Sequence, residues 1–253
     1  MEILPIHYPF TFLLITFLVF YHVNPAFRYF CKMSFYKLWI FILSCLIIII
    51  SVPRGRNVEN MKFLCMMLLP LKYIFGIKIV VKGKENLRTK KPFILVLNHQ
   101  TSLDIMVMME ILPSHCVPVA KKEILYMGTF GLIMLGVLFL HVFSLLQFRV
   151  LIFPEGPCNH GGSMLPFKRG AFQLAVQAQV PIIPVVISSY DNFYSQKKKR
   201  FTTGKGHLGQ RILPEVETLG LGPDDVPKFT EQVRVSMLAT YQEISGVVNG
   251  ASH

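Results

Sequence analysis

Three short apolar runs, each passing directly into a polar or glycine-rich turn, constrain the fold of this chain more than any other feature. They are residues 93–97, the start of the block 152–172, and residues 180–190. Short apolar runs bounded by proline and glycine are typical of buried strands. Strands that alternate with helices predict an α/β fold with a mostly parallel sheet flanked by helices. The other elements that we expect are an amphipathic stretch at 61–75, strands at 77–81 and 117–120, and helices at 105–112 and 227–245.

The turn after the first run carries a candidate catalytic pair, His99 and Asp104. A strand that ends in Asn-His presents the imidazole at the edge of the sheet where α/β proteins usually build their sites. A carboxylate across the following turn can reach one ring nitrogen and fix the tautomer. The other nitrogen is then a usable general base near neutral pH. On spacing alone, a surface histidine followed by a helix-capping aspartate fits these residues equally well.

The composition indicates contact with a lipid bilayer. The chain is 52% hydrophobic and only 16% charged, and its mean hydropathy is +0.48. Two apolar segments, 4–23 and 38–52, are candidate spans, although the second is short for a bilayer core that needs about 20 apolar residues. We expect a membrane anchor with one or two transmembrane helices in residues 1–60 and a catalytic domain in residues 61–253. Basic residues flank the second segment on both sides, so they give no orientation.

The net charge of +12 favours anionic partners such as lipid headgroups and phosphorylated substrates. Nucleic acid is not expected as a partner, because the basic residues are scattered apart from 197–200 and no nucleic-acid-binding motif accompanies them. The five cysteines are odd in number and scattered, which predicts no disulfide framework and a reducing compartment for the catalytic part. No metal site is expected, because Cys158 and His160, with His99 or His115, lack paired ligand spacing.

The turn 98–104, the block 152–172 and the run 180–190 together carry a resemblance to a known family. In this order they resemble the glycerolipid acyltransferases, most closely the animal 1-acylglycerol-3-phosphate O-acyltransferases of the alpha type, over residues 55–227. The resemblance implies an endoplasmic reticulum membrane enzyme of phospholipid biosynthesis. Such an enzyme transfers an acyl group from acyl-CoA to the free hydroxyl of lysophosphatidate, giving phosphatidate. It implies no cofactor beyond acyl-CoA as co-substrate, and it makes 61–253 an acyltransferase domain.

The resemblance also implies roles for individual residues. It assigns catalysis to the His-Asp pair of the first turn, and acceptor binding to Glu155 and Gly156. Lys168 and Arg169, with backbone N–H groups of the glycine-rich turn, could hold the phosphate, although an ordinary solvated basic pair is the alternative. The substrate-binding residues that we expect are Glu155, Gly156, Lys168, Arg169, Gly170 and Pro184, and the expected backbone donors belong to Gly156, Gly161 and Gly162.

No serine or cysteine with a nearby base is evident in the sequence. The pattern therefore favours direct attack of the acceptor hydroxyl on the acyl thioester, with His99 as the base. Residues 130–148 carry no formal charge. We expect them to be buried sheet, core or a membrane-surface contact, because a span there would separate His99 from Glu155.

The second block departs from the family pattern. Relatives read Glu-Gly-Thr-Arg where this chain has Glu-Gly followed by Pro157 and Cys158, so an arginine and one backbone donor are missing. This change leaves open a catalytically impaired membrane relative that acts as a partner or scaffold. It also leaves open an acyltransferase for glycerol 3-phosphate or another lysophospholipid.

Overall fold

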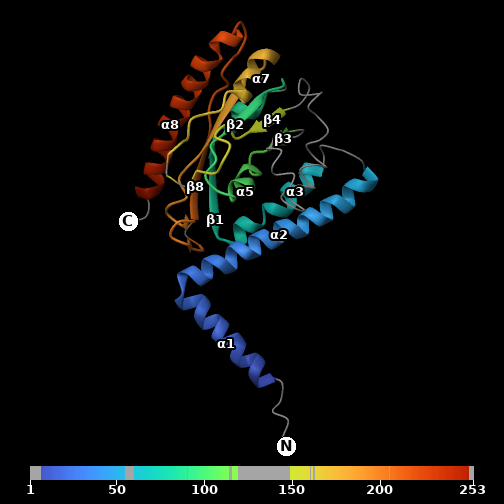
Figure 1. Ribbon diagram of the computed structural model, residues 1–253, viewed down its shortest axis with the longest axis vertical. Helices are drawn as coiled ribbons and strands as arrows, with labels where there is room; N and C mark the ends of the chain where they lie inside the picture. Colours follow the sequence, from blue (N-terminus) through green and yellow to red (C-terminus); the bar gives the residue numbers. More distant parts are fainter. Residues whose placement is uncertain are drawn as a thin grey trace, which may run out of the picture.

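The computed structural model describes residues 7–54, 60–89, 91–113, 116–118, 149–159, 161, 163–204 and 206–250. Its central element is a six-stranded sheet in the order β1-β8-β5-β2-β4-β3 (Figure 1). All neighbouring strands in it are parallel except β5 and β8, which confirms the mostly parallel sheet. The strands are β1 (Ile77–Lys82), β2 (Ile94–Leu97), β3 (Cys116–Pro118), β4 (Arg149–Ile152), β5 (Ile182–Ile187) and β8 (Gly206–Ile212), while β6 (Tyr194–Ser195) and β7 (Arg200–Phe201) form a separate antiparallel pair.

Helices pack on both faces of this sheet (Figure 1). Helices α7 (Gly170–Ala178) and α8 (Val226–Gly250) share one hydrophobic cluster with the sheet. Helices α2 (Pro25–Arg54) and α5 (Asp104–Met108) contribute to a second cluster on the other face. The remaining helices are α1 (His7–Val23), α3 (Asn60–Leu68), α4 (Leu71–Ile74) and the 3-10 helices η1 (Lys84–Leu87) and η4 (Pro223–Asp225).

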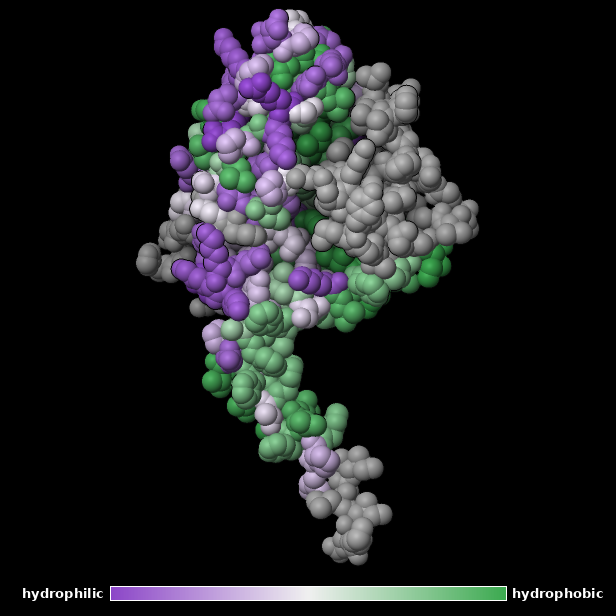
Figure 2. Space-filling model, viewed as in Figure 1, coloured by the Kyte–Doolittle hydropathy of each residue, from purple (hydrophilic) through white to green (hydrophobic). Residues whose placement is uncertain are grey.

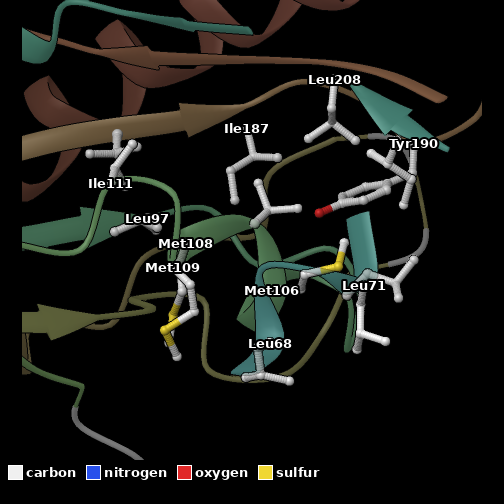
Figure 3. Packing of buried hydrophobic residues seen from close by; sticks show 14 of the residues in the cluster. Leu68, Leu71, Leu97, Met106, Met108, Met109, Ile111, Ile187, Tyr190 and Leu208 are labelled. Atoms are coloured by element: carbon white, nitrogen blue, oxygen red, sulfur yellow. The ribbon is translucent and has the colours of Figure 1, made fainter. Parts of the chain in front are cut away.

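Strand β2 explains why the apolar runs are continuous rather than alternating. Ile94 and Val96 belong to the cluster under α7 and α8, whereas Leu95 and Leu97 belong to the opposite cluster. Figure 3 shows part of that opposite cluster, with Leu97 among its members. Successive side chains of a strand point to opposite faces, so a strand covered on both sides is apolar at every position. Burying each such side chain contributes about 1.5–3 kcal/mol.

The break between α1 and α2 has a local cause at Asn24. Its Oδ1 accepts hydrogen bonds from the N–H groups of Ala26 and Phe27, both at 3.0 Å. Asparagine is a preferred helix N-cap, and Pro25 occupies the first helical position, where its missing N–H costs nothing. Helix α2 therefore begins at Pro25. The apolar segment 38–52 is the later part of this longer helix and not a separate one.

Helix α1 exposes an apolar surface, which Figure 2 shows as a hydrophobic extension below the body of the molecule. Among the described residues, no helix alone has the length and apolar character needed to cross a bilayer. The pair Tyr8–Val23 and Pro25–Leu43 meets that requirement jointly, across a bend of 107°. The division of the chain at residue 60 remains a prediction.

Helix α2 packs on the α/β part of the molecule through polar as well as apolar contacts. The Nζ of Lys32 donates to the carbonyl oxygen of Phe201 at 2.7 Å and also to the hydroxyl of Thr203. The hydroxyl of Tyr36 donates to the carbonyl oxygen of Ser102 at 2.9 Å. Because Ser102 lies in the turn that carries the candidate pair His99 and Asp104, α2 is fixed directly to that turn.

Most of the expected elements are present. Strands occur near 77–81, 93–97, 117–120 and within 180–190, and the closing helix is present as α8. The amphipathic stretch at 61–75 is divided into α3 and α4 at Pro70. The segment 130–148 lies outside the described residues.

Candidate functional site

The site lies at the carboxyl ends of β2 and β4, where the turns that follow these two parallel strands meet. Asn98 fixes the first turn to the sheet: its Nδ2 donates to the carbonyl oxygen of Ile187 at 2.9 Å. In return, the N–H of Ile187 donates to Oδ1 of Asn98 at 2.8 Å. The side chain of Asn98 thus continues the hydrogen-bond pattern between β2 and β5 for one more step. His99 consequently begins from a rigid point at the sheet edge, where α/β folds build their sites.

The His-Asp contact expected from the sequence is present. Nδ1 of His99 lies 2.8 Å from Oδ2 of Asp104. The same oxygen accepts the backbone N–H groups of Gln100 at 2.6 Å and Thr101 at 2.9 Å, and Asp104 is fully buried. The ring of Phe153 stacks on His99 at a centroid distance of 4.3 Å. These contacts fix the imidazole plane and engage Nδ1. Nε2 is therefore the ring nitrogen that can exchange a proton with another group.

Glu155 joins the two turns. Its Oε1 accepts the backbone N–H of His99 and its Oε2 accepts that of Leu165, each at 2.8 Å. The N–H of Asn159 donates to the carbonyl oxygen of His99 at 2.8 Å, which adds a second link. Glu155 is 3% exposed, and burial raises its pKa although the two N–H groups act in the opposite direction. Both carboxylate oxygens are thus engaged within the protein, and Glu155 serves as an internal brace.

We expect Glu155→Gln to lower the free energy of unfolding by about 2 kcal/mol, because the amide loses the charge and can accept only one of the two N–H groups well. Denaturant unfolding monitored by intrinsic fluorescence measures this change. Glu215→Gln, at an exposed position, is the matched control and should be neutral. Equal stability of the two variants would contradict the role of Glu155 as a brace.

A contact that sequence reasoning missed completes the site: Sγ of Cys158 lies 3.2 Å from Nε2 of His99. The expectation that no cysteine has a nearby base is therefore wrong. Residues 98–104 and 155–158 are far apart in the chain and meet because β2 and β4 are parallel neighbours. All five cysteines are free thiols in this structure. The only sequence signal available was that both segments follow strands of the same sheet.

The pKa of His99 reflects its burial and two of these contacts. Burial lowers it, but the hydrogen bonds to Asp104 and Cys158 outweigh burial and raise it from 6.5 to about 10. We expect a histidine-labelled NMR titration, assigned with His99→Gln, to give a midpoint near 10. Cys158→Ala should move the midpoint to lower pH, and a wild-type midpoint near 6.5 would contradict the contacts.

The same shift links stability to pH. Because folding raises the pKa of His99, the protonated ring stabilises the folded state. This contribution is complete below pH 6.5 and is lost as the pH rises to about 10.

A cavity of about 590 Å³ opens beside Cys158. Its wall includes Tyr29, Phe30 and Met33 of α2, and two cations, Lys37 and Lys199, also line it. Volumes of this size are usual for small-molecule sites. An apolar wall with two ammonium groups suits a ligand that combines a hydrocarbon chain with a phosphate.

The other expected binding residues lie elsewhere. Lys168, Arg169 and Gly170 are exposed at the start of α7, and Pro184 is buried in β5 opposite Val96. None of them is among the residues described as lining the cavity beside Cys158. Lys168 and Arg169 lie on the surface between the buried side chains of Phe167 and Ala171.

The glycine-rich turn does not offer the expected donors at its described positions. The N–H of Gly156 donates to the carbonyl oxygen of Phe153 at 3.2 Å, and that of Gly161 donates to Oδ1 of Asn159 at 2.9 Å. Gly156 has a φ of 84°, which explains glycine there. Gly162, His115 and His160 lie outside the described residues. Within the described ranges, no group of three metal-ligating side chains occurs.

Comparison with known proteins places this geometry in context. A family model described as Acyltransferase matches residues 78–188. The chain is 50% identical over 240 residues to the 1-acyl-sn-glycerol-3-phosphate acyltransferase alpha of Ovis aries, covering 88% of this chain and 83% of that protein. It is 37% identical over 252 residues to the human 1-acyl-sn-glycerol-3-phosphate acyltransferase beta, covering 92% and 90%.

A solved structure has a similar fold. It is the crystal structure of the 1-acyl-sn-glycerophosphate acyltransferase of Thermotoga maritima, with a TM-score of 0.61 and 19% sequence identity. The match covers 85% of this chain and 96% of that one. This agrees with the α/β fold and its mostly parallel sheet described above.

Proposed function

Because this chain belongs to the acyltransferase family, we propose that it transfers an acyl group from acyl-CoA to the free hydroxyl of lysophosphatidate, giving phosphatidate. The observation that carries the proposal is the buried contact of Asp104 with His99, whose other nitrogen meets Cys158 at the wall of the cavity. The neutral form of the imidazole accepts the proton of the attacking hydroxyl through Nε2. Because the pKa of His99 is raised to about 10, the fraction of the ring in this form increases as the pH rises from neutral toward 10. Asp104 holds the ring and stabilises the imidazolium that forms.

The cavity beside Cys158 supports a lysophospholipid as the acceptor. Phe30 and Met33 provide apolar contact for a chain, and Lys37 and Lys199 provide positive charge for a phosphate. These two lysines supply the positive charge for which the resemblance implies an arginine in the second block. A charged hydrogen bond to phosphate contributes about 1.5–3 kcal/mol. The surface residues Lys168 and Arg169 can then act only at the approach to the site.

We also propose that the enzyme works at the endoplasmic reticulum membrane. The exposed apolar surface of α1 and the net charge of +12 support attachment to an anionic bilayer. Both substrates carry long acyl chains and partition into such a bilayer. Phosphatidate formed there is available to the enzymes of phospholipid synthesis.

The test is an acceptor panel with the full-length protein in lipid nanodiscs. Labelled oleoyl-CoA is supplied with lysophosphatidate, glycerol 3-phosphate or lysophosphatidylcholine, and the lipid products are separated. The proposal predicts labelled phosphatidate as the main product. Turnover with only one of the other acceptors would replace lysophosphatidate by that acceptor, and the absence of any product would reject the proposed function.

A further inference from the structure

Three side chains stand in line at the junction of the two turns. The distance from Sγ of Cys158 to Nε2 of His99 is 3.2 Å, and that from Nδ1 of His99 to Oδ2 of Asp104 is 2.8 Å. A nucleophile, a base and an orienting carboxylate within hydrogen-bond reach are the signature of nucleophilic catalysis.

From this geometry we infer that Cys158 carries the acyl group between donor and acceptor as an S-acyl thioester. The inference rests on the proposed acyl transfer and adds a covalent step to it. It replaces the direct attack on acyl-CoA that the sequence favours. The position where the resemblance implies an arginine and this chain has a cysteine thereby becomes the carrier of the acyl group.

The first half-reaction loads the thiol. When the ring of His99 is in its neutral form, the proton of Cys158 passes to Nε2, and the sulfur attacks the carbonyl carbon of acyl-CoA. A bond forms between this carbon and Sγ, and the bond from carbon to the sulfur of CoA breaks. The CoA thiolate takes the proton from His99 and leaves as the free thiol. One thioester is exchanged for another, so no oxidant or further reactant is needed.

The second half-reaction transfers the acyl group from Cys158 to the acceptor. The hydroxyl of the acceptor gives its proton to Nε2 of His99, and its oxygen attacks the acyl carbon on Cys158. The carbon–oxygen bond forms, the bond to Sγ breaks, and the proton returns from His99 to the sulfur. The products are the acylated acceptor and the free enzyme.

The contacts of His99 explain why the thiol should react first. In the free enzyme Nε2 already faces Sγ, so the nearest proton for the imidazole is that of Cys158 and not that of a lipid hydroxyl. Acylation removes the S–H group, which frees Nε2 for the acceptor. It also removes one of the hydrogen bonds that raise the pKa of His99, so the ring becomes neutral more readily when a base is required.

The cavity can hold the acyl chain while it is attached to Cys158. Cys158 lines the same space as Phe30 and Met33, so a chain attached to Sγ can extend along the apolar side of α2. Lys37 and Lys199 line it as well, and they can hold the phosphate of the acceptor near the loaded sulfur. Donor and acceptor can thus use one site in succession.

The experiment traps the acyl-enzyme. Full-length protein in nanodiscs is mixed with labelled oleoyl-CoA without acceptor and quenched in acid. We expect close to one acyl group per protein, a matching burst of free CoA, release of the label by neutral hydroxylamine, and a modified peptide that contains Cys158. Adding lysophosphatidate should move the label from protein to phosphatidate, and initial rates should follow ping-pong kinetics.

Variants separate this step from spontaneous acylation of thiols. Cys158→Ala should abolish trapping and lower phosphatidate formation by at least about a hundredfold, with slow direct attack as the residual reaction. Cys158→Ser should transfer slowly through an ester that resists neutral hydroxylamine. Cys31→Ala, at another partly exposed thiol that does not contact His99, is the matched control and should behave as wild type.

The outcomes distinguish the two proposals. Phosphatidate formation by Cys158→Ala at the wild-type rate, with no trapped acyl group, would overturn the carrier role and leave the proposed function intact. A trapped acyl group on Cys158 that passes to water or another acceptor but not to lysophosphatidate would support the carrier role. That result would reject lysophosphatidate as the acceptor.

Discussion

Replacing His99 by alanine is expected to lower the rate of phosphatidate formation by about 10⁴-fold, the upper end of what a general base contributes. The imidazole serves both the thiol and the acceptor hydroxyl, so its removal disables each half-reaction. Initial rates with labelled oleoyl-CoA and lysophosphatidate give the value. The same variant should also fail to trap an acyl group on Cys158.

The matched control is His207→Ala, because His207 is exposed on β8 and belongs to no part of the site. It should keep wild-type rates. Thermal unfolding of both variants shows whether loss of activity reflects loss of fold. A His99→Ala protein that is folded and within tenfold of wild-type activity would remove His99 from the mechanism.

The second large effect is expected for Asp104→Asn, which should lower activity by about 10³-fold or more. The amide keeps the size of the side chain and can still accept backbone N–H groups, but it has no charge to stabilise the imidazolium. Because the hydrogen bond to Asp104 raises the pKa of His99, the NMR midpoint of His99 should also fall from about 10 toward 6.5.

This midpoint distinguishes a positioning role from a structural one. Asp224→Asn, on an exposed 3-10 helix, is the control and should change neither the rate nor the midpoint. If Asp104→Asn lost activity while the His99 midpoint stayed near 10, Asp104 would act through the fold of the turn and not through the charge on the ring.

The sequence predicts those strands that are buried on both sides. Residues 93–97 and 180–187 are apolar at every position or nearly so, since helices cover both faces of the sheet there. Strand β8 escaped prediction because it contains Gly206 and Gly209, and glycine is depleted in strands. Its burial nevertheless alternates along the strand, and its antiparallel pairing with β5 comes from the tertiary fold.

The contacts of the candidate site likewise fall into local ones, which the sequence can suggest, and long-range ones, which it cannot. The contact of His99 with Asp104 lies within one turn, so the local spacing allows it, although spacing alone fits a surface histidine and a helix-capping aspartate equally well. The contacts of His99 with Glu155 and Cys158 depend on which strands are neighbours in the sheet, and that order is not written in either segment. The cavity lysines Lys37 and Lys199 come from distant segments, α2 and the β6–β7 connection, and no local pattern connects them.

Helix α2 has a practical consequence for anyone preparing this protein. Its residues Tyr29, Phe30 and Met33 form one side of the cavity, and Tyr36 holds the turn that bears the reacting groups. A shortened version that starts after Arg54, made to ease purification in water, would lose this side of the cavity and would expose the hydrophobic cluster that α2 covers. Detergent or nanodisc preparations of the intact polypeptide are therefore the proper material for kinetics and crystallisation.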